Sequence, residues 1–203
     1  MAEVPGTAGY AAEAPDLMQR YERGDTARLH RPVLHLMPQP PAHVLEIGAG
    51  TGRDAAWFAA RGFTVTAVEP VDALREGAMR LHTVETIRWI DDGLPELKSI
   101  AGEHEAYDLV MLTAVLMHLD APQRLGAMRT IAQLVRPGGV IMLYMRHGPV
   151  PEGRTMFDVT AEEIKAISAP LDLTPIFELL DEPDGRSRPG VSWTRLVLQK
   201  AAG

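Results

Sequence analysis

The segment from Val44 to Pro70 constrains the fold more than any other part of the sequence. A short apolar run at 44–47 leads into a glycine-rich loop, an Ala-rich stretch at 53–61 and a β-branched run at 63–68 that ends at Glu69. This pattern predicts a buried strand, a helix and a second strand. Two strands joined by a helix lie parallel, so the segment predicts a parallel sheet with helices on both faces.

The loop between the first strand and the helix has the spacing of a nucleotide site. Its sequence is Gly48-Ala49-Gly50-Thr51-Gly52. Glycines permit positive φ and a close backbone approach to a ligand, and the helix start offers free N–H groups. Glu69, at the end of the second strand, is placed to accept hydrogen bonds from ribose hydroxyls. A dinucleotide site needs G-x-G-x-x-G, and its third glycine would fall at Arg53, so the spacing disfavours a pyrophosphate-binding loop.

The G-x-G-x-G loop, with Val44-Leu45-Glu46 before it and Glu69 after it, resembles the first motif of class I S-adenosylmethionine-dependent methyltransferases. The resemblance continues through the segments 90–95, 107–119 and 134–139 and covers about 44–145. It implies a Rossmann-like, three-layer αβα sandwich. The expected sheet is seven-stranded and mostly parallel, with an antiparallel last strand between strands five and six. The implied cofactor is S-adenosyl-L-methionine.

The same resemblance implies which residues contact the cofactor. Glu69 would bind the ribose, Glu46 the methionine amino group, and Thr113 would lie near the methionine portion. Asp91 or Asp92 would meet the adenine amino group, and the sequence leaves that choice open. The full expected set is Glu46, Gly48, Ala49, Gly50, Thr51, Gly52, Glu69, Pro70, Asp91, Asp92, Thr113 and Tyr21, the last offering an aromatic face to the sulfonium.

His118 is the candidate catalytic residue. It follows the fourth expected strand, on the side where the methyl group would lie, and an imidazole can take a proton near neutral pH. The alternative is a packing histidine, because methyl transfer can proceed by alignment and desolvation alone. The other histidines show no metal-ligand spacing with a carboxylate cluster, so we expect no metal site.

The rest of the chain predicts one domain over 1–203. We expect residues 1–15 to be flexible, 16–40 to form an N-terminal helical lid with a helix at 17–30, and 42–203 to form the Rossmann-like core. Further helices are expected at 72–81, 94–100 and 120–135 and after a capping box at 160–163. Further strands are expected at 86–90, 107–112, 140–145, 173–180 and 192–199. Pro175 would place its strand at the sheet edge.

Composition limits the possible functions. The chain has 203 residues, a net charge of −7 and no cysteine. The charge argues against strong nucleic-acid binding, and the missing cysteine excludes thiolate chemistry. No signal peptide or membrane-length apolar run is seen, so we expect a cytoplasmic protein that methylates a small molecule. The alternatives are a cofactor-binding regulatory or partner protein without catalysis and a nicotinamide-dependent oxidoreductase. The oligomeric state is left open.

Overall fold

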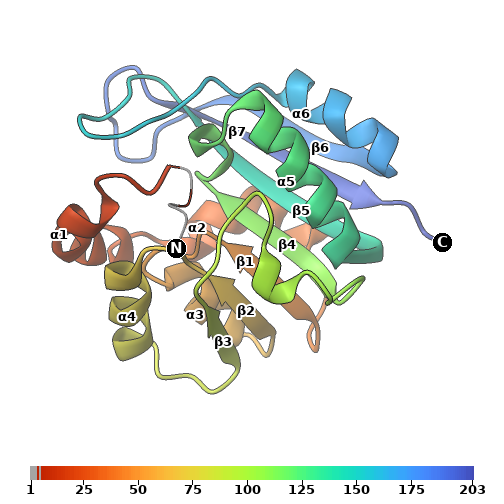
Figure 1. Cartoon of the computed structure of the whole chain (residues 1–203), viewed down its shortest axis with the longest axis horizontal. Coiled ribbons are helices and arrows are strands. Elements are labelled where there is room, and N and C mark those ends of the chain that lie inside the picture. Colours follow the sequence, from red (N-terminus) through yellow and green to blue (C-terminus); the bar gives the residue numbers. More distant parts are fainter. Residues whose placement is uncertain (1–3, 5) are drawn as a thin grey trace.

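A seven-stranded sheet with the order β3-β2-β1-β4-β5-β7-β6 forms the middle of the molecule (Figure 1). The computed structural model describes Val4 and residues 6–203. Strands β1 to β5 are parallel, and β7 runs antiparallel between β5 and β6. The strands are β1 His43–Ile47, β2 Thr64–Val68, β3 Ile87–Ile90, β4 Tyr107–Thr113, β5 Val135–His147, β6 Leu173–Pro183 and β7 Ser192–Lys200. The predicted sheet is confirmed, and Pro175 lies in the edge strand β6 as expected.

Helices cover both faces of this sheet. They are α1 Tyr10–Glu22, α2 Thr26–His30, α3 Arg53–Ala59, α4 Asp72–Leu81, α5 Ala121–Leu134 and α6 Ala161–Ser168. Successive strand residues point to opposite faces, so Leu109 packs in the core layer that contains α3, whereas Val110 packs in the layer that contains α5 and α6. α1 packs against α4 at the side of the sheet, with Leu17 and Leu74 in one small cluster (Figure 1). The three-layer prediction is therefore correct.

The N-terminal region differs from the prediction. Instead of one helix at 17–30, two helices are present, and the first begins at Tyr10. Asp25 separates them, because its side chain caps α2 by accepting the N–H of Arg28 at 3.0 Å. Residues 10–15, expected to be flexible, are thus helical, and Ala14 is buried against α4 and the loop before it. The remainder of the expected flexible segment lies partly outside the described residues.

Three other local predictions were wrong. The segment 94–100 contains only the 3-10 turn Lys98–Ile100. β5 begins at Val135, directly after α5 and before the expected start at residue 140, so that Pro137-Gly138-Gly139 lies inside the strand. The expected capping box of α6 is half formed: Thr160 caps the N–H of Glu163, but the Glu163 carboxylate instead pairs with Arg124 at 2.7 Å.

Candidate cofactor and acceptor site

The glycine loop follows β1 at the carboxyl edge of the sheet. Its three glycines all have positive φ, which explains why glycine occupies these positions. At Gly48 a Cβ would lie 2.6 Å from Cγ2 of Val115, so the backbone here is tightly packed. At Gly50 nothing lies within 4 Å of a built Cβ, so this part of the loop faces open space. Gly50 is therefore the point of the loop at which a ligand can approach the backbone.

Glu69 lies beside this loop, directly after β2. Its side chain is only 5% exposed, and it accepts the N–H groups of Gly50 at 2.7 Å and Val71 at 2.9 Å. Burial raises the pKa of the carboxyl, while the two backbone N–H donors oppose that rise. Each oxygen keeps a further acceptor position. Glu69 is thus bonded to the glycine loop, its role toward a ribose stays a prediction, and Pro70 follows it beside Gly93.

Two of the predicted cofactor residues carry buried polar atoms that lack a partner among the described residues. Glu46, at 5% exposure, has an unpaired Oε2, and the Oγ1 of Thr113 is also unpaired. Burial, together with the nearby Asp54 carboxylate, raises the pKa of Glu46 well above its usual value. An ammonium donor would satisfy the Glu46 oxygen and offset its desolvation. These atoms therefore fit the methionine end of S-adenosylmethionine.

The structure separates the two adjacent aspartates after β3. Both carboxylate oxygens of Asp92 accept backbone N–H groups, those of Gly93 at 2.7 Å and Ser99 at 2.6 Å. Asp91 is exposed and pairs through one oxygen with Arg75 at 3.1 Å. Asp92 thus holds the turn, whereas Asp91 retains an oxygen that can accept from a ligand.

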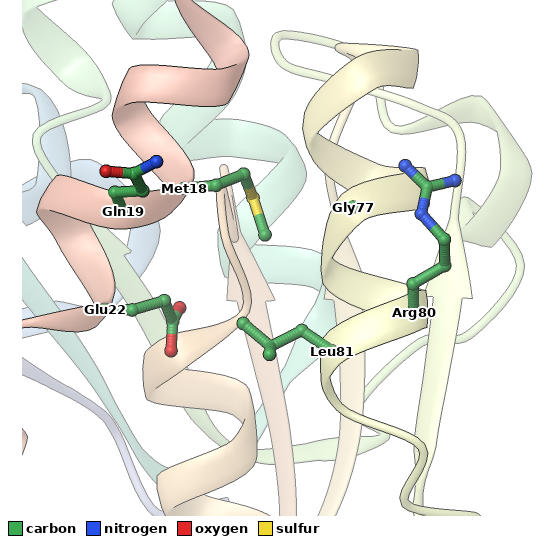
Figure 2. Close-up of a pocket in the computed structure, with 6 residues that line it drawn as sticks. All are labelled: Met18, Gln19, Glu22, Gly77, Arg80 and Leu81. Atoms are coloured by element: carbon green, nitrogen blue, oxygen red, sulfur yellow. The ribbon is translucent and has the colours of Figure 1, made fainter.

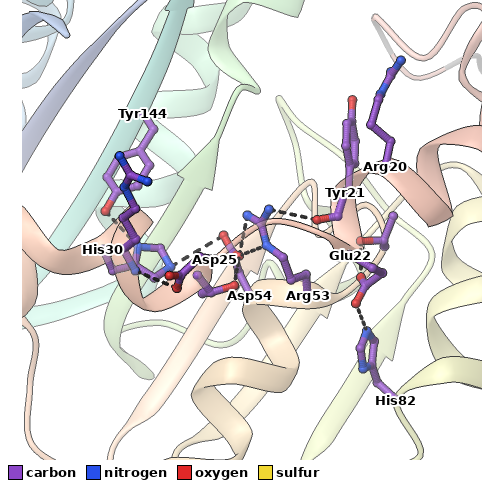
Figure 3. A network of polar contacts seen from close by, with 12 residues as sticks. Arg20, Tyr21, Glu22, Asp25, His30, Arg53, Asp54, His82 and Tyr144 are labelled. Atoms are coloured by element: carbon purple, nitrogen blue, oxygen red, sulfur yellow. Dashed lines mark hydrogen bonds and ion pairs between the residues drawn. The ribbon is translucent and has the colours of Figure 1, made fainter. Parts of the chain in front are cut away.

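The N-terminal helices are bonded to the glycine loop by a polar network (Figure 3). The hydroxyl of Thr51 donates to Glu22 of α1 at 2.5 Å, and Arg53 donates to the carbonyl of Tyr21 at 3.1 Å. Arg53 also pairs with the buried Asp54 at 2.7 Å. Thr51 therefore contacts α1, and the tyrosine expected over the sulfonium is tied to the start of α3 through its backbone.

The same network continues into the sheet through His30 of α2. Its Nδ1 lies 2.9 Å from the hydroxyl of Tyr144 in β5, and its Nε2 lies 3.6 Å from Asp54 (Figure 3). Burial outweighs the nearby carboxylate and lowers the pKa of His30 to about 4. The imidazole is thus neutral near pH 7, and it joins α2, α3 and β5 in the interior.

His118 has a defined tautomer. Its Nδ1 lies 3.0 Å from the carbonyl oxygen of Thr155, which can only accept, so Nδ1 carries the proton. Its Nε2 lies 3.0 Å from the hydroxyl of Tyr10, which therefore donates to it. Burial lowers the pKa of His118 and raises that of Tyr10 to about 12. At neutral pH the His118 imidazole is thus neutral, and its unprotonated Nε2 accepts a hydrogen bond from the Tyr10 hydroxyl.

Sequence reasoning missed Tyr10 because it lies in a segment expected to be flexible. Its ring lies under the guanidinium of Arg154, 3.4 Å from the ring centre. Arg154 also donates to the carbonyl of Ala8 at 3.2 Å and pairs with Glu13 at 3.0 Å. A Cβ built on Gly6 would overlap the side chain of His118. The segment before α1 therefore packs directly on the candidate base, and no local sequence signal indicates this contact.

A shallow groove of about 520 Å³ lies between α1 and α4 (Figure 2). Gly77 of α4 allows the close approach of Met18 from α1, whose sulfur lies 3.1 Å from a built Cβ. Leu81, in the last turn of α4, lines this groove and is 53% exposed. Of the groove residues, Glu22 is the one bonded to the glycine loop.

The described part of the chain contains neither a metal-binding cluster nor a helix of the membrane-spanning kind. In that part, no group of three His, Asp or Glu side chains is arranged to hold a metal ion. No helix in the same part has both the length and the apolar character that a membrane span requires.

The chain is similar in sequence to known methyltransferases. Ubiquinone biosynthesis O-methyltransferase of Xanthomonas campestris pv. campestris is 32% identical over 51% of this chain and 43% of that protein. Glycine N-methyltransferase of Rattus norvegicus is 28% identical over 73% of this chain and 58% of that protein. The chain thus spans under two thirds of the length of either relative.

A solved structure and a family model extend these matches. The structure of Burkholderia thailandensis 1,6-didemethyltoxoflavin-N1-methyltransferase, with S-adenosylhomocysteine bound, has a TM-score of 0.75 at 21% identity and covers 95% of this chain and 85% of that one. The model of the methyltransferase domain family matches residues 18–165, which is more than half of the chain. The chain therefore belongs to the methyltransferase domain family.

Proposed function

We propose that this protein transfers the methyl group of S-adenosylmethionine to a nitrogen or oxygen atom of a small molecule. The observation that carries the proposal is the glycine loop, whose open Gly50 donates to Glu69, together with the unpaired Oε2 of Glu46 in the strand that leads into the loop. Membership of the methyltransferase domain family supports it, and the relatives named above are N- and O-methyltransferases by name.

Each residue of the site then has a task. The bound cofactor would supply an electrophilic methyl group, so the protein must place a nucleophile in line with it and exclude water. Glu46 would hold the ammonium of the cofactor, Glu69 its ribose and Asp91 its adenine. The helix α1 would act as a lid over the site, since it is bonded to the loop through Thr51.

His118 would serve as the general base. Its Nε2 is unprotonated and already accepts a hydroxyl proton, that of Tyr10, at 3.0 Å. An acceptor hydroxyl that displaces the Tyr10 hydroxyl would stand at the same nitrogen and lose its proton to it as the methyl group is transferred, whereas an acceptor ammonium would lose its proton there first and attack as the neutral amine. Tyr10 would therefore have to move when the acceptor binds.

Calorimetric titration with S-adenosylmethionine, S-adenosylhomocysteine and NAD tests the proposal. We expect saturable binding of the first two and none of NAD, and we expect Glu69→Ala to weaken that binding while the protein remains folded. Binding of NAD alone would refute the cofactor assignment. Cofactor binding without any methylated product from a panel of small amines, phenols and carboxylic acids would favour the regulatory, non-catalytic alternative.

A further inference from the structure

Arg146, near the carboxyl end of β5, is a buried cation without a carboxylate partner among the described residues. It is 8% exposed, and its Nε makes no hydrogen bond. One Nη donates to the carbonyl of Pro149 at 2.9 Å, and the other lies 3.9 Å from the sulfur of Met156. Because a guanidinium stays charged and a buried charge is costly when unpaired, Arg146 has unused capacity to bind an anion.

The nearby acidic residue does not fill this capacity. Asp184 accepts two bonds from the guanidinium of Arg188, at 2.8 and 3.0 Å, and one from the indole of Trp193 at 2.9 Å. Its Oδ2 also accepts the backbone N–H groups of Arg186 and Arg188. These donors hold the pKa of Asp184 well below its usual range. The charge of Asp184 is thus committed to its own loop.

Arg146 and the candidate base contact the same loop. One Nη of Arg146 lies 3.9 Å from the sulfur of Met156, and the carbonyl oxygen of the preceding residue, Thr155, accepts from Nδ1 of His118 at 3.0 Å. In the β4–β5 register Thr113 lies opposite Tyr144, two residues before Arg146. The positive charge of Arg146 also contributes to the lowered pKa of His118. The cation therefore stands at the end of the sheet where Thr113 and His118 lie.

Other nearby arginines are already paired. Arg154 is bonded to Glu13 and Ala8, and Arg188 is bonded to Asp184. They add positive potential, whereas Arg146 alone among the three combines burial with an unpaired donor in the described structure. In a chain with a net charge of −7, this local excess of positive charge is well suited to an anionic ligand.

We propose that Arg146 binds an oxyanion group of the methyl acceptor, a carboxylate or a phosphate, and thereby holds the nucleophile beside His118. The inference rests on the proposed function and names the acceptor class. Guanidinium donors match the geometry of such oxyanions and form strong charge-assisted hydrogen bonds with them. Arg146 is then a specificity-determining residue for acidic small molecules.

Anion binding tests the proposal separately from catalysis. Protein saturated with S-adenosylhomocysteine, and the same protein without it, would be titrated with formate, acetate, benzoate and inorganic phosphate, with benzamide as the neutral counterpart of benzoate. We compare wild type with Arg146→Met. The control is Arg136→Met, at the other end of β5, where the arginine is largely exposed and pairs with Asp108 at 2.7 Å.

We expect at least one anion to bind wild type and Arg136→Met about tenfold or more tightly than Arg146→Met, and benzamide to show no such difference. A carboxylate or a phosphate preference then identifies the group. If Arg146→Met does not fold, the Nε–H resonance of Arg146 in the wild-type protein should still shift on anion addition. No anion preference and no resonance shift would overturn the inference, whereas failure to bind S-adenosylhomocysteine would count against the proposed function instead.

Discussion

Gly50 offers a direct test of the cofactor loop, because strain and ligand binding can be separated there. Its φ is 58°, and a Cβ at this position would meet nothing within 4 Å. An alanine therefore costs only the left-handed backbone conformation, about 1–2 kcal/mol in the free energy of unfolding. For a chain of this size that lowers Tm by about 2–8 °C. We expect Gly50→Ala also to weaken S-adenosylhomocysteine binding at least about tenfold, since the methyl group enters the open face of the loop.

Gly138 provides the matched control. It lies near the amino end of β5, has a φ of 74°, and likewise has nothing within 4 Å of a built Cβ. Gly138→Ala should lose similar stability in urea unfolding and keep wild-type affinity in calorimetry. Gly48→Ala should lose about 1–3 kcal/mol more than either, because its methyl group would overlap Val115. Unchanged affinity in Gly50→Ala, or an equal loss of affinity in Gly138→Ala, would refute the reasoning.

Three further predictions follow from buried charged and titratable groups. Burial lowers the pKa of His118 below 6.5, so kcat/KM should rise with pH below 6.5 and be level near neutrality, and the His118→Asn variant should lose most activity. A rise of kcat/KM confined to alkaline pH would contradict a role for His118. The pKa of His30 is about 4 in the folded protein, so between pH 6.5 and 4 the unfolded chain binds a proton that the folded chain does not. The free energy of unfolding should therefore fall by about 3 kcal/mol over this pH range, and His30→Gln should remove that pH dependence in urea unfolding. Arg124 is buried and bonded to the partly exposed Glu163 at 2.7 and 3.0 Å, so Arg124→Met should cost about 2–4 kcal/mol, and a loss below about 0.5 kcal/mol would show that the pair contributes little.

Elements with a strong local signal were predicted well. α4 has the predicted bounds, and β1 and β2 differ from prediction by one residue at their starts. The segment 94–100 was mistaken for a helix because Leu94, Leu97 and Ile100 follow a spacing of three residues and are all buried. Burial of a loop on the core produces the same spacing, so the pattern alone does not distinguish the two. β5 was predicted too short because its pairing of Val135 with Tyr107 depends on the neighbouring strand.

The candidate site likewise contains residues that local sequence predicts and residues whose role depends on distant contacts. Gly50 and Glu69 were predicted from spacing and Glu46 from the family resemblance; in the structure Gly50 donates to Glu69, and the charges of Glu46 and Glu69 are close enough to interact, while their roles toward a cofactor stay predictions. Tyr10 was missed, because its contact with His118 spans 108 residues of sequence. Arg146 was also missed, because an arginine near the end of an apolar strand gives no signal of whether a carboxylate will meet it.

Consecutive residues were enough to predict the parallel sheet, the glycine loop and the acidic residue beside it, because strand and helix periodicity and glycine spacing are local properties of the chain. The tertiary contacts show that both oxygens of Asp92 accept backbone N–H groups of its own turn, whereas one oxygen of Asp91 makes no hydrogen bond within the described residues. Only the tertiary structure decided that His118 carries its proton on Nδ1 and that Arg146 is left buried without a counter-ion in the described structure. The physical reason is that protonation and charge pairing depend on which groups meet in space, and those groups come from distant segments.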